Sequence, residues 1–308
     1  MITQIQTVVR LLKQGGVVAL PTETVYALAC DVQKLEAVAR IFRIKKRNHD
    51  HPLSVLIPNT DALNYWTKSL PDVGQRLIQN FWPGPLTLVL QRAESSAACL
   101  LGMSESIALR LPDHAITRAI LDYFPLGLAA PSANRTHQLS PTTANHVCDY
   151  LGAEIDYIID AGSCSLGIES TLVDVCTYPP RLLREAALTK MQIRSCVSEV
   201  EMTAQTMSKA SAIQSIQPND LETQLTQLLS HLEKNSCIAI LARRPVLIVH
   251  PQLFWITMPE SVRDYAQQLY EKLHVCLQKK ISAIFIEALP EEAQWSGVRA
   301  TLQRILSL

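Results

Sequence analysis

Basic side chains gather in one short segment of the chain, directly before an apolar run. Arg and Lys donate hydrogen bonds to phosphate and carboxylate oxygens, so such a cluster suits an anionic ligand. The competing interpretation is a solvated helix end, where cations complement the helix dipole. The cluster precedes residues 52–57 and consists of Arg40, Arg43, Lys45, Lys46 and Arg47.

A single arginine, Arg110, interrupts the apolar run 107–111. A charge buried in a strand is costly unless a partner compensates it. The partner is either an Asp or Glu side chain or the carboxylate of a ligand, which arginine binds in a bidentate manner. The sequence favours neither.

Hydroxyl groups follow the first apolar run. In LPTETVYALACD, residues 20–31, Thr22 and Thr24 come after a strand that ends at Pro21. Ligands of open α/β sheets bind at the carboxyl ends of strands, so both threonines are candidate ligand contacts. The alternative is a polar turn in which one of them caps a following helix.

Two later segments repeat this arrangement. In GLAAPSANRTHQLSPTT, residues 127–143, an apolar strand runs into Ser132, and we expect Ser140 or Thr142 to cap the next helix. Helix N-termini of this kind suit anions. In IIDAGSCSLGIESTLVDV, residues 158–175, glycines bracket a serine-rich loop whose N–H groups are suited to an anion nest. Ordinary strand connections are the alternative for both.

No arrangement typical of a nucleophilic or metal-dependent hydrolase competes with these segments. The chain has no GK[ST] or GxGxxG motif, no HExxH and no CxxC pair. We interpret FWPGPLTLVL, residues 81–90, as a tight turn before a strand. The pattern therefore indicates a site that holds anions, without a nucleophilic side chain.

Strands and helices intermix along the first 190 residues, which favours an α/β fold with a mixed, twisted sheet. The predicted helices are 2–14, 35–44, 71–80, 113–123 and 142–150. The predicted strands are 17–20, 52–57, 86–90, 107–111, 126–130, 157–159 and 171–175.

The composition changes near residue 195. We predict one domain over 1–194, a polar linker over 195–218 and a small α/β domain over 219–308. The last domain alternates strands and helices like half of a doubly wound sheet. Its predicted helices are 219–233, 261–278 and 291–306, and its strands are 237–241, 255–258 and 281–287.

The charge balance limits the possible partners. The 28 basic residues equal the 28 acidic residues, whereas tight nucleic-acid binders usually carry a basic excess. We expect any contact with tRNA to be weak and local. The eight cysteines form no metal or disulfide pattern, and the N-terminal residues resemble no signal peptide. We expect a cytoplasmic protein with no membrane segment.

Six motifs in one order carry a family resemblance. PTETVYALACD, KKRNHDHPL, FWPGPLTLVL, ALRLPDH, APSANR with SPTT, and DAGSCSLGIESTLVDV resemble the YrdC-type L-threonylcarbamoyladenylate synthases over residues 1–193. The remaining residues resemble the C-terminal domain of the long form of this family. The resemblance implies a twisted sheet around a large positive cavity, followed by a small Rossmann-like domain.

The resemblance also implies roles for individual residues. Lys45 and Arg47 would be catalytic, offsetting phosphate charge together with Arg184. The positions that match nucleotide contacts are Arg47, His51, Ser106, Ser132, Asn134, Ser140 and Arg184. The positions that match L-threonine contacts are Thr24, Arg110, Ala130 and Ser170.

By the same resemblance, the substrates are ATP with Mg²⁺, L-threonine and bicarbonate or CO₂, and no protein metal site is expected. Downstream threonylcarbamoyl transferase machinery for tRNA would use the adenylate. In LLREAAL, Glu185 stands where the family usually has proline, and its carboxylate could pair with Arg184. The alternatives are a catalytically weakened homologue that binds nucleotide or RNA, and a carbamoyl or threonylcarbamoyl transferase with another acceptor.

Overall fold

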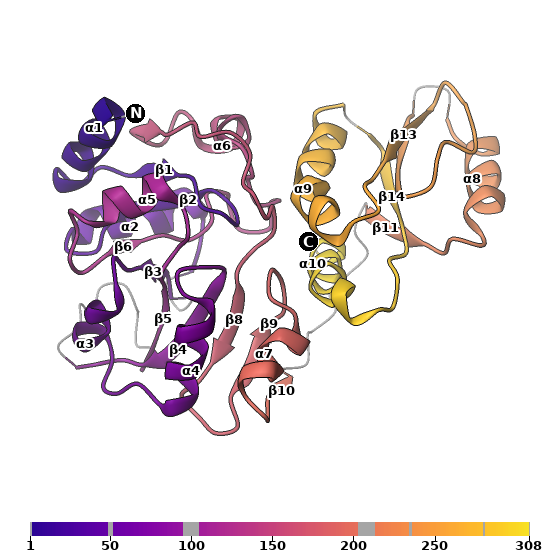
Figure 1. Ribbon diagram of the computed structural model, residues 1–308. Coiled ribbons are helices and arrows are strands. Elements are labelled where there is room, and N and C mark those ends of the chain that lie inside the picture. Colours follow the sequence, from indigo (N-terminus) through magenta and orange to yellow (C-terminus); the bar gives the residue numbers. More distant parts are fainter. Residues whose placement is uncertain are drawn as a thin grey trace.

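The strands of the N-terminal part of the chain form one mixed sheet (Figure 1). The computed structural model describes residues 2–48, 52–94, 105–202, 213–233, 236–279 and 281–307. Within them, ten strands lie in the order β10-β9-β8-β4-β5-β3-β6-β2-β1-β7. They are β1 (Val18–Leu20), β2 (Ala27–Asp31), β3 (Ser54–Leu56), β4 (Leu86–Gln91), β5 (Ser106–Arg110), β6 (Leu128–Ala129), β7 (Tyr157–Ile158), β8 (Thr171–Asp174), β9 (Arg181–Arg184) and β10 (Glu201–Met202).

Both faces of this sheet are covered at β1, which explains why this short strand is wholly apolar. Successive side chains of a strand point to opposite faces. Val18 and Leu20 of β1 pack in one core with Leu12, whereas Ala19 packs in a second core with Ile41. A strand buried on both sides therefore appears in the sequence as a continuous apolar run.

Helices supply the two covering layers. The N-terminal part contains α1 (Ile2–Lys13), α2 (Leu35–Lys45), α3 (Leu63–Trp66), α4 (Asp72–Phe81), α5 (Ala115–Leu121), α6 (Ala144–Leu151) and α7 (Lys190–Cys196), with a 3₁₀ turn at Thr60–Ala62. The predicted mixed α/β fold is confirmed. In the described ranges, no helix is long and apolar enough to cross a membrane.

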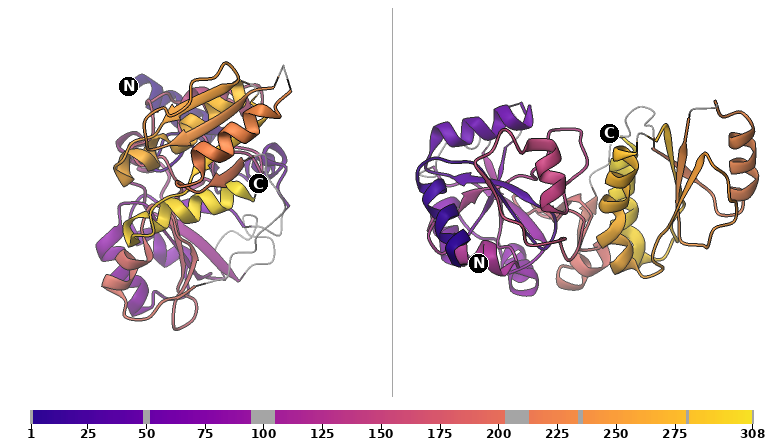
Figure 2. Two further views of the ribbon diagram at one scale, coloured as in Figure 1. Left: turned by 90° about the vertical axis from the view of Figure 1, so that its right-hand side faces the viewer. Right: turned by 90° about the horizontal axis from the view of Figure 1, so that it is seen from above.

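The C-terminal part has a separate, fully parallel sheet in the order β11-β14-β12-β13. Helices α9 and α10 lie between the two sheets and α8 lies on the far side (Figures 1 and 2). The bounds are β11 (Ile213–Ile216), α8 (Leu221–Ser230), β12 (Ile238–Ala242), β13 (Leu253–Thr257), α9 (Val262–Gln278), β14 (Ala283–Glu287), a 3₁₀ turn (Ala293–Trp295) and α10 (Ser296–Leu306).

Two strands lie in 195–218, the range predicted to be a linker with little strand character. β10 pairs with β9 in the first sheet, and β11 pairs with β14 in the second. Backbone pairing therefore ties both ends of this range to the two sheets. The domain boundaries themselves remain a proposal.

Helices α9 and α10 pack closely on loops of the N-terminal part. Leu139 and Ile168 belong to the same apolar core as Leu269 of α9. A Cβ atom on Gly167 would overlap the backbone of Gln267 in α9, and one on Gly297 would overlap the Ala186 carbonyl oxygen. The absence of a side chain at these two glycines permits the close approach.

A stacked pair of histidines lies within the same contact. The rings of His146 on α6 and His274 on α9 are 3.8 Å apart, centroid to centroid. His274 Nε2 lies 3.2 Å from the Ser140 carbonyl oxygen, and His274 Nδ1 lies 3.3 Å from the Tyr150 hydroxyl. These partners favour a neutral ring that donates from Nε2 and accepts at Nδ1.

Low pH should weaken the packing of α9 on the N-terminal part at His274. Burial and the neighbouring His146 lower the pKa of His274 to about 4, against the opposing effects of Ser140 and Asp149. Between the ordinary pKa of 6.5 and about 4, the unfolded state therefore binds the extra proton. We expect this group to lower the free energy of unfolding by roughly 3 kcal/mol as the pH falls through that window.

Urea unfolding of the protein and of His274→Gln at several pH values measures this effect. Glutamine keeps a donor for the Ser140 carbonyl but does not titrate. The variant should lose stability less steeply between pH 6.5 and 4. Parallel curves for the two proteins would exclude His274 as the source of the acid sensitivity.

Candidate active site

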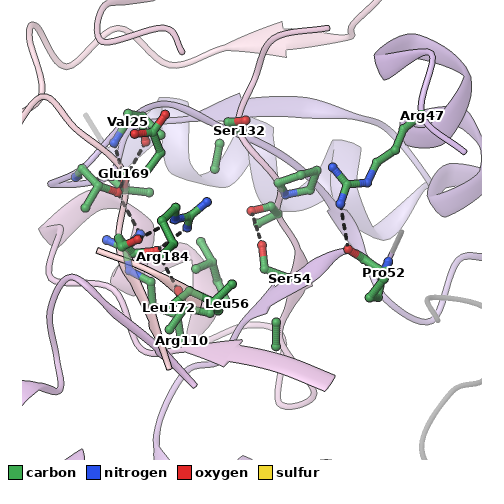
Figure 3. A pocket seen from close by; sticks show the side chains of 18 residues that line it. Val25, Arg47, Pro52, Ser54, Leu56, Arg110, Ser132, Glu169, Leu172 and Arg184 are labelled. Atoms are coloured by element: carbon green, nitrogen blue, oxygen red, sulfur yellow. Dashed lines mark hydrogen bonds between the residues drawn. The ribbon is translucent and has the colours of Figure 1, made fainter. Parts of the chain in front are cut away.

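A cavity of about 200 Å³ opens in the N-terminal part where several strands end (Figure 3). Arg47 lies at one end of it, and Arg110 and Arg184 lie toward the other. Three guanidinium groups against one carboxylate make its lining cationic. The lining residues are Thr22, Thr24, Val25, Ala27, Arg47, Pro52, Ser54, Leu56, Thr87, Ala108, Arg110, Ala130, Pro131, Ser132, Glu169, Ser170, Leu172 and Arg184.

The turn between β1 and β2 provides the first hydroxyl groups. Thr22 Oγ1 donates to the Val25 carbonyl at 2.6 Å and accepts from the N–H groups of Thr24 and Val25 at 3.2 Å. The predicted alternative, a threonine that caps a helix, is wrong because strand β2 follows this turn. The missed strand is short and wholly buried, so it shows no alternation.

Arg110 has a protein partner. Its Nη2 lies 2.6 Å from Glu23 Oε1, and both side chains are less than a tenth exposed. Neither atom makes a hydrogen bond of good geometry to a described residue, so charge attraction dominates this contact. Arg110 also donates from Nη1 to Thr24 Oγ1 at 2.8 Å and from Nε to the Gly84 carbonyl at 3.1 Å.

These contacts answer the question that the sequence left open. Of the two possible partners, the structure places Glu23 beside Arg110. A guanidinium has five N–H donors, and Arg110 uses Nε and one donor of Nη1 in hydrogen bonds. Because Arg110 also lines the cavity, the second donor of Nη1 can serve a ligand oxygen, whereas Nη2 is buried against Glu23.

Arg184 and Ser170 form the opposite wall. Arg184 donates from Nε to the Ser170 carbonyl at 2.9 Å and from Nη2 to Ser170 Oγ at 3.2 Å. Ser170 Oγ also lies 2.7 Å from Thr87 Oγ1. Burial and the nearby Arg304 lower the pKa of Arg184 to about 10, so its guanidinium stays charged at neutral pH.

Glu185 does not pair with Arg184, contrary to the possibility raised by the sequence. Its Oε1 accepts from the Lys190 N–H at 2.6 Å and from Ser296 Oγ at 2.5 Å. The first contact lies at the start of α7 and the second at the start of α10. Glu185 therefore fixes the start of α10, and Arg184 remains part of the cavity lining.

Lys45 and Asn134 lie behind the cavity wall. Lys45 Nζ donates to the carbonyl oxygens of Ser132 and Asn134 at 2.5 and 2.6 Å. Burial, with repulsion from Arg47, lowers the pKa of Lys45 to about 7. Lys45 thus fixes the loop that carries Ser132, which itself lines the cavity.

The other predicted residues fall into three groups. Thr24, Arg47 and Ala130 line the cavity, and Arg47 also donates to the Pro52 carbonyl at 3.2 Å. Ser106 is the first residue of β5 and pairs with Gln91 outside the lining. The predicted His51 lies outside the described residues.

Ser140 contacts the cavity indirectly. It does not cap α6 as predicted, and neither does Thr142, because the Thr143 hydroxyl accepts from the His146 N–H at 3.2 Å. Ser140 Oγ instead donates to Glu169 Oε1 at 2.8 Å. The Ser140 hydroxyl, which was predicted to cap a helix, therefore donates to a carboxylate that lines the cavity.

The sequence patterns indicated neither of the two carboxylates at the site, Glu23 and Glu169. Glu23 stands between the two threonines of the first turn, and Glu169 directly precedes Ser170. Their positions beside predicted ligand-binding residues could have indicated them, because the buried arginines of a cationic site need acidic partners.

Comparisons with known proteins match this arrangement. The family model Sua5_yciO_yrdC, described as "Telomere recombination", matches residues 10–186. The chain belongs to the Sua5/YciO/YrdC family. The threonylcarbamoyl-AMP synthases of Pyrococcus abyssi and Bacillus subtilis are 38% and 36% identical over 62% and 65% of the chain. These alignments cover 56% and 58% of the two relatives, little more than half of their length.

Solved structures of this family extend the similarity to the C-terminal part. The crystal structure of P. abyssi Sua5 complexed with L-threonine has a TM-score of 0.88 at 28% identity. That superposition covers 98% of this chain and 93% of the Sua5 chain. A doubly substituted variant of the same Sua5 protein gives a TM-score of 0.89 at 26% identity. Both sheets therefore belong to the Sua5 fold.

Proposed function

We propose that this protein is an L-threonylcarbamoyladenylate synthase, which joins L-threonine, bicarbonate or CO₂, and ATP. The observation that carries the proposal is the convergence of Arg47, Arg110 and Arg184 on one hydroxyl-lined cavity. The sequence similarity to threonylcarbamoyl-AMP synthases and the fold of threonine-bound Sua5 support it.

In this reaction the amine of L-threonine adds to CO₂ and forms a carbamate. A carbamate oxygen then attacks the α-phosphorus of ATP, the bond to the β-phosphate oxygen breaks, and pyrophosphate leaves. Such chemistry depends on positioning and on stabilisation of phosphate charge rather than on a protein nucleophile. We propose that Mg²⁺ enters with ATP, because it commonly binds through phosphates and water.

The residues divide between the two substrates, which would meet where Arg110 and Arg184 lie toward the same end of the cavity. We propose that Arg110, held by Glu23 and Thr24, binds the threonine carboxylate, with Ala130 and Ser170 nearby. Arg47 and Arg184 would neutralise phosphate charge, while Lys45 and Asn134 fix the loop of Ser132. The adenylate would then pass to a threonylcarbamoyl transferase that modifies tRNA, with any direct tRNA contact weak.

Pyrophosphate release from Mg²⁺ and ATP tests this proposal, with mass spectrometry of the nucleotide products. We expect release to depend on both L-threonine and bicarbonate and to accompany threonylcarbamoyl-AMP. L-serine should replace L-threonine poorly. Nucleotide binding without dependence on either co-substrate would reject the synthase and favour a weakened, nucleotide-binding homologue.

A further inference from the structure

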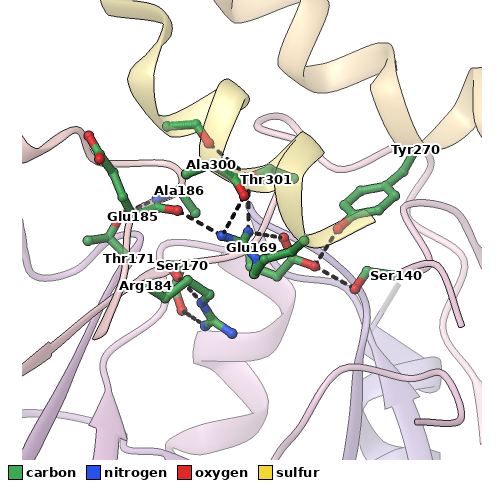
Figure 4. A network of polar contacts seen from close by, with 12 residues as sticks. Ser140, Glu169, Ser170, Thr171, Arg184, Glu185, Ala186, Tyr270, Ala300 and Thr301 are labelled. Carbon is green, nitrogen blue, oxygen red and sulfur yellow. Dashed lines mark hydrogen bonds and ion pairs between the residues drawn. The ribbon is translucent and has the colours of Figure 1, made fainter. Parts of the chain in front are cut away.

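Glu169 connects the cavity with the C-terminal part of the chain (Figure 4). Its Oε1 accepts from Ser140 Oγ at 2.8 Å and from the Tyr270 hydroxyl of α9 at 2.6 Å. Its Oε2 lies 3.3 Å from Arg304 Nη2 of α10. Helices α9 and α10 of the C-terminal part thus hold a carboxylate that lines the cavity.

This carboxylate is charged despite its burial. Desolvation alone would raise the pKa of Glu169, but Arg304 and Arg184, with the hydroxyls of Tyr270 and Ser140, hold it below its ordinary value. A buried carboxylate needs every one of its hydrogen bonds, because each lost donor leaves desolvated charge uncompensated. The Tyr270 hydroxyl is therefore important for the geometry of the cavity wall.

Helix α9 also holds Ser140 from its other side. His274 lies one turn after Tyr270, and its Nε2 is 3.2 Å from the Ser140 carbonyl oxygen. Residues four apart share one face of a helix. Tyr270 thus orients the hydroxyl of Ser140 through Glu169, and His274 contacts the backbone of Ser140 directly.

We propose that Tyr270 of the C-terminal part is a positioning residue for the nucleotide site, acting through Glu169 on Ser140 and on the adjacent Arg184. This inference rests on the proposed function, which assigns Arg184 to the phosphates of ATP, and on the family resemblance, which implies that Ser140 contacts the nucleotide. It gives the C-terminal part a specific role, which is to orient groups that bind ATP. Arg110, the proposed clamp for the L-threonine carboxylate, contacts Glu23, Thr24 and Gly84 rather than Glu169, so we expect threonine binding to depend much less on this network.

The same helix offers a matched control. Tyr265 lies five residues before Tyr270 on α9 and is 1% exposed, and its hydroxyl has no hydrogen-bond partner among the described residues. Tyr265→Phe and Tyr270→Phe each remove one buried hydroxyl from α9. Only the second removes a donor from Glu169.

The experiment measures the affinity for ATP by calorimetry and the KM values for ATP and L-threonine. We expect Tyr270→Phe to weaken ATP binding about tenfold, because it removes a hydrogen bond to a charged acceptor. The KM for L-threonine should stay within about twofold, and Tyr265→Phe should match the unmodified protein. In a Ser140→Ala background, Tyr270→Phe should reduce ATP affinity less than it does in the unmodified protein, since only the path through Arg184 then remains.

The outcomes separate this inference from the proposed function. Unchanged ATP affinity in Tyr270→Phe, equal losses for both substrates, or full additivity with Ser140→Ala would overturn the inference. If the unmodified protein binds ATP but forms no adenylate, the synthase proposal fails, and the calorimetry still tests the role of Tyr270. If it does not bind ATP, both proposals are rejected.

Discussion

Replacing Arg110 with alanine should reduce threonine-dependent pyrophosphate release by on the order of 100-fold or more, because it removes the proposed carboxylate clamp. It should also destabilise the protein, since Glu23 would remain buried without its ion-pair partner. Breaking a buried ion pair from one side typically costs about 3–5 kcal/mol. Steady-state kinetics and urea unfolding measure the two effects.

A second variant separates these effects. Arg110→Met combined with Glu23→Gln removes both charges and keeps similar volumes. Replacement of a buried pair by neutral groups is often tolerated, so we expect most of the stability to return. Activity should remain low in the double variant. A double variant with nearly normal kcat/KM for L-threonine would show that Arg110 serves folding and not the substrate.

Replacing Gly297 with alanine should destabilise the packing of α10 on the N-terminal part of the chain. By helix propensity alone, alanine at this position in α10 would stabilise the protein by up to about 1 kcal/mol. The added Cβ would instead overlap the Ala186 carbonyl oxygen, so α10 must shift. We expect a net loss of about 1–3 kcal/mol and weaker ATP binding, because Arg304 moves with this helix.

Gln303→Ala provides the comparison, since Gln303 is an exposed position on the same helix. That variant should unfold at the urea concentration of the unmodified protein. Gly297→Ala should unfold earlier and with a similar dependence on urea. If Gly297→Ala proves more stable than the unmodified protein, helix propensity outweighs the steric conflict, and the close approach of α10 to Ala186 is not needed for stability.

The sequence predicted the elements with strong apolar patterns and missed those without one. Helix α9 was predicted within one residue, because its buried side chains recur at helical spacing along its length. Strand β11 was missed because its residues, Ile213–Ile216, contain two polar side chains inside a polar stretch. Pairing with β14, distant in sequence, makes it a strand.

The residues of the candidate site were likewise predictable only where a local sequence pattern indicates them. Arg110 stood out because a charge in an apolar strand is rare, and the structure gives it both a partner and a place in the cavity. The roles of Ser140 and Glu185 depend on helices that are distant in sequence, since the contacts through Glu169, Tyr270 and Ser296 arise by tertiary packing. No local sequence pattern indicates such contacts. The family resemblance identified residues that contact ligands but not the side chains that hold those residues.

The shared apolar core has a consequence for synthesis of the protein. Leu139 and Ile168 belong to the N-terminal part, yet residues of α9 and α10, which are translated more than 90 residues later, complete their apolar core. At about 5–20 residues per second, the nascent chain exposes these side chains for several seconds or longer before α10 is complete. Premature termination after α7 would leave them permanently uncovered, so we expect such fragments to depend on chaperones and to aggregate.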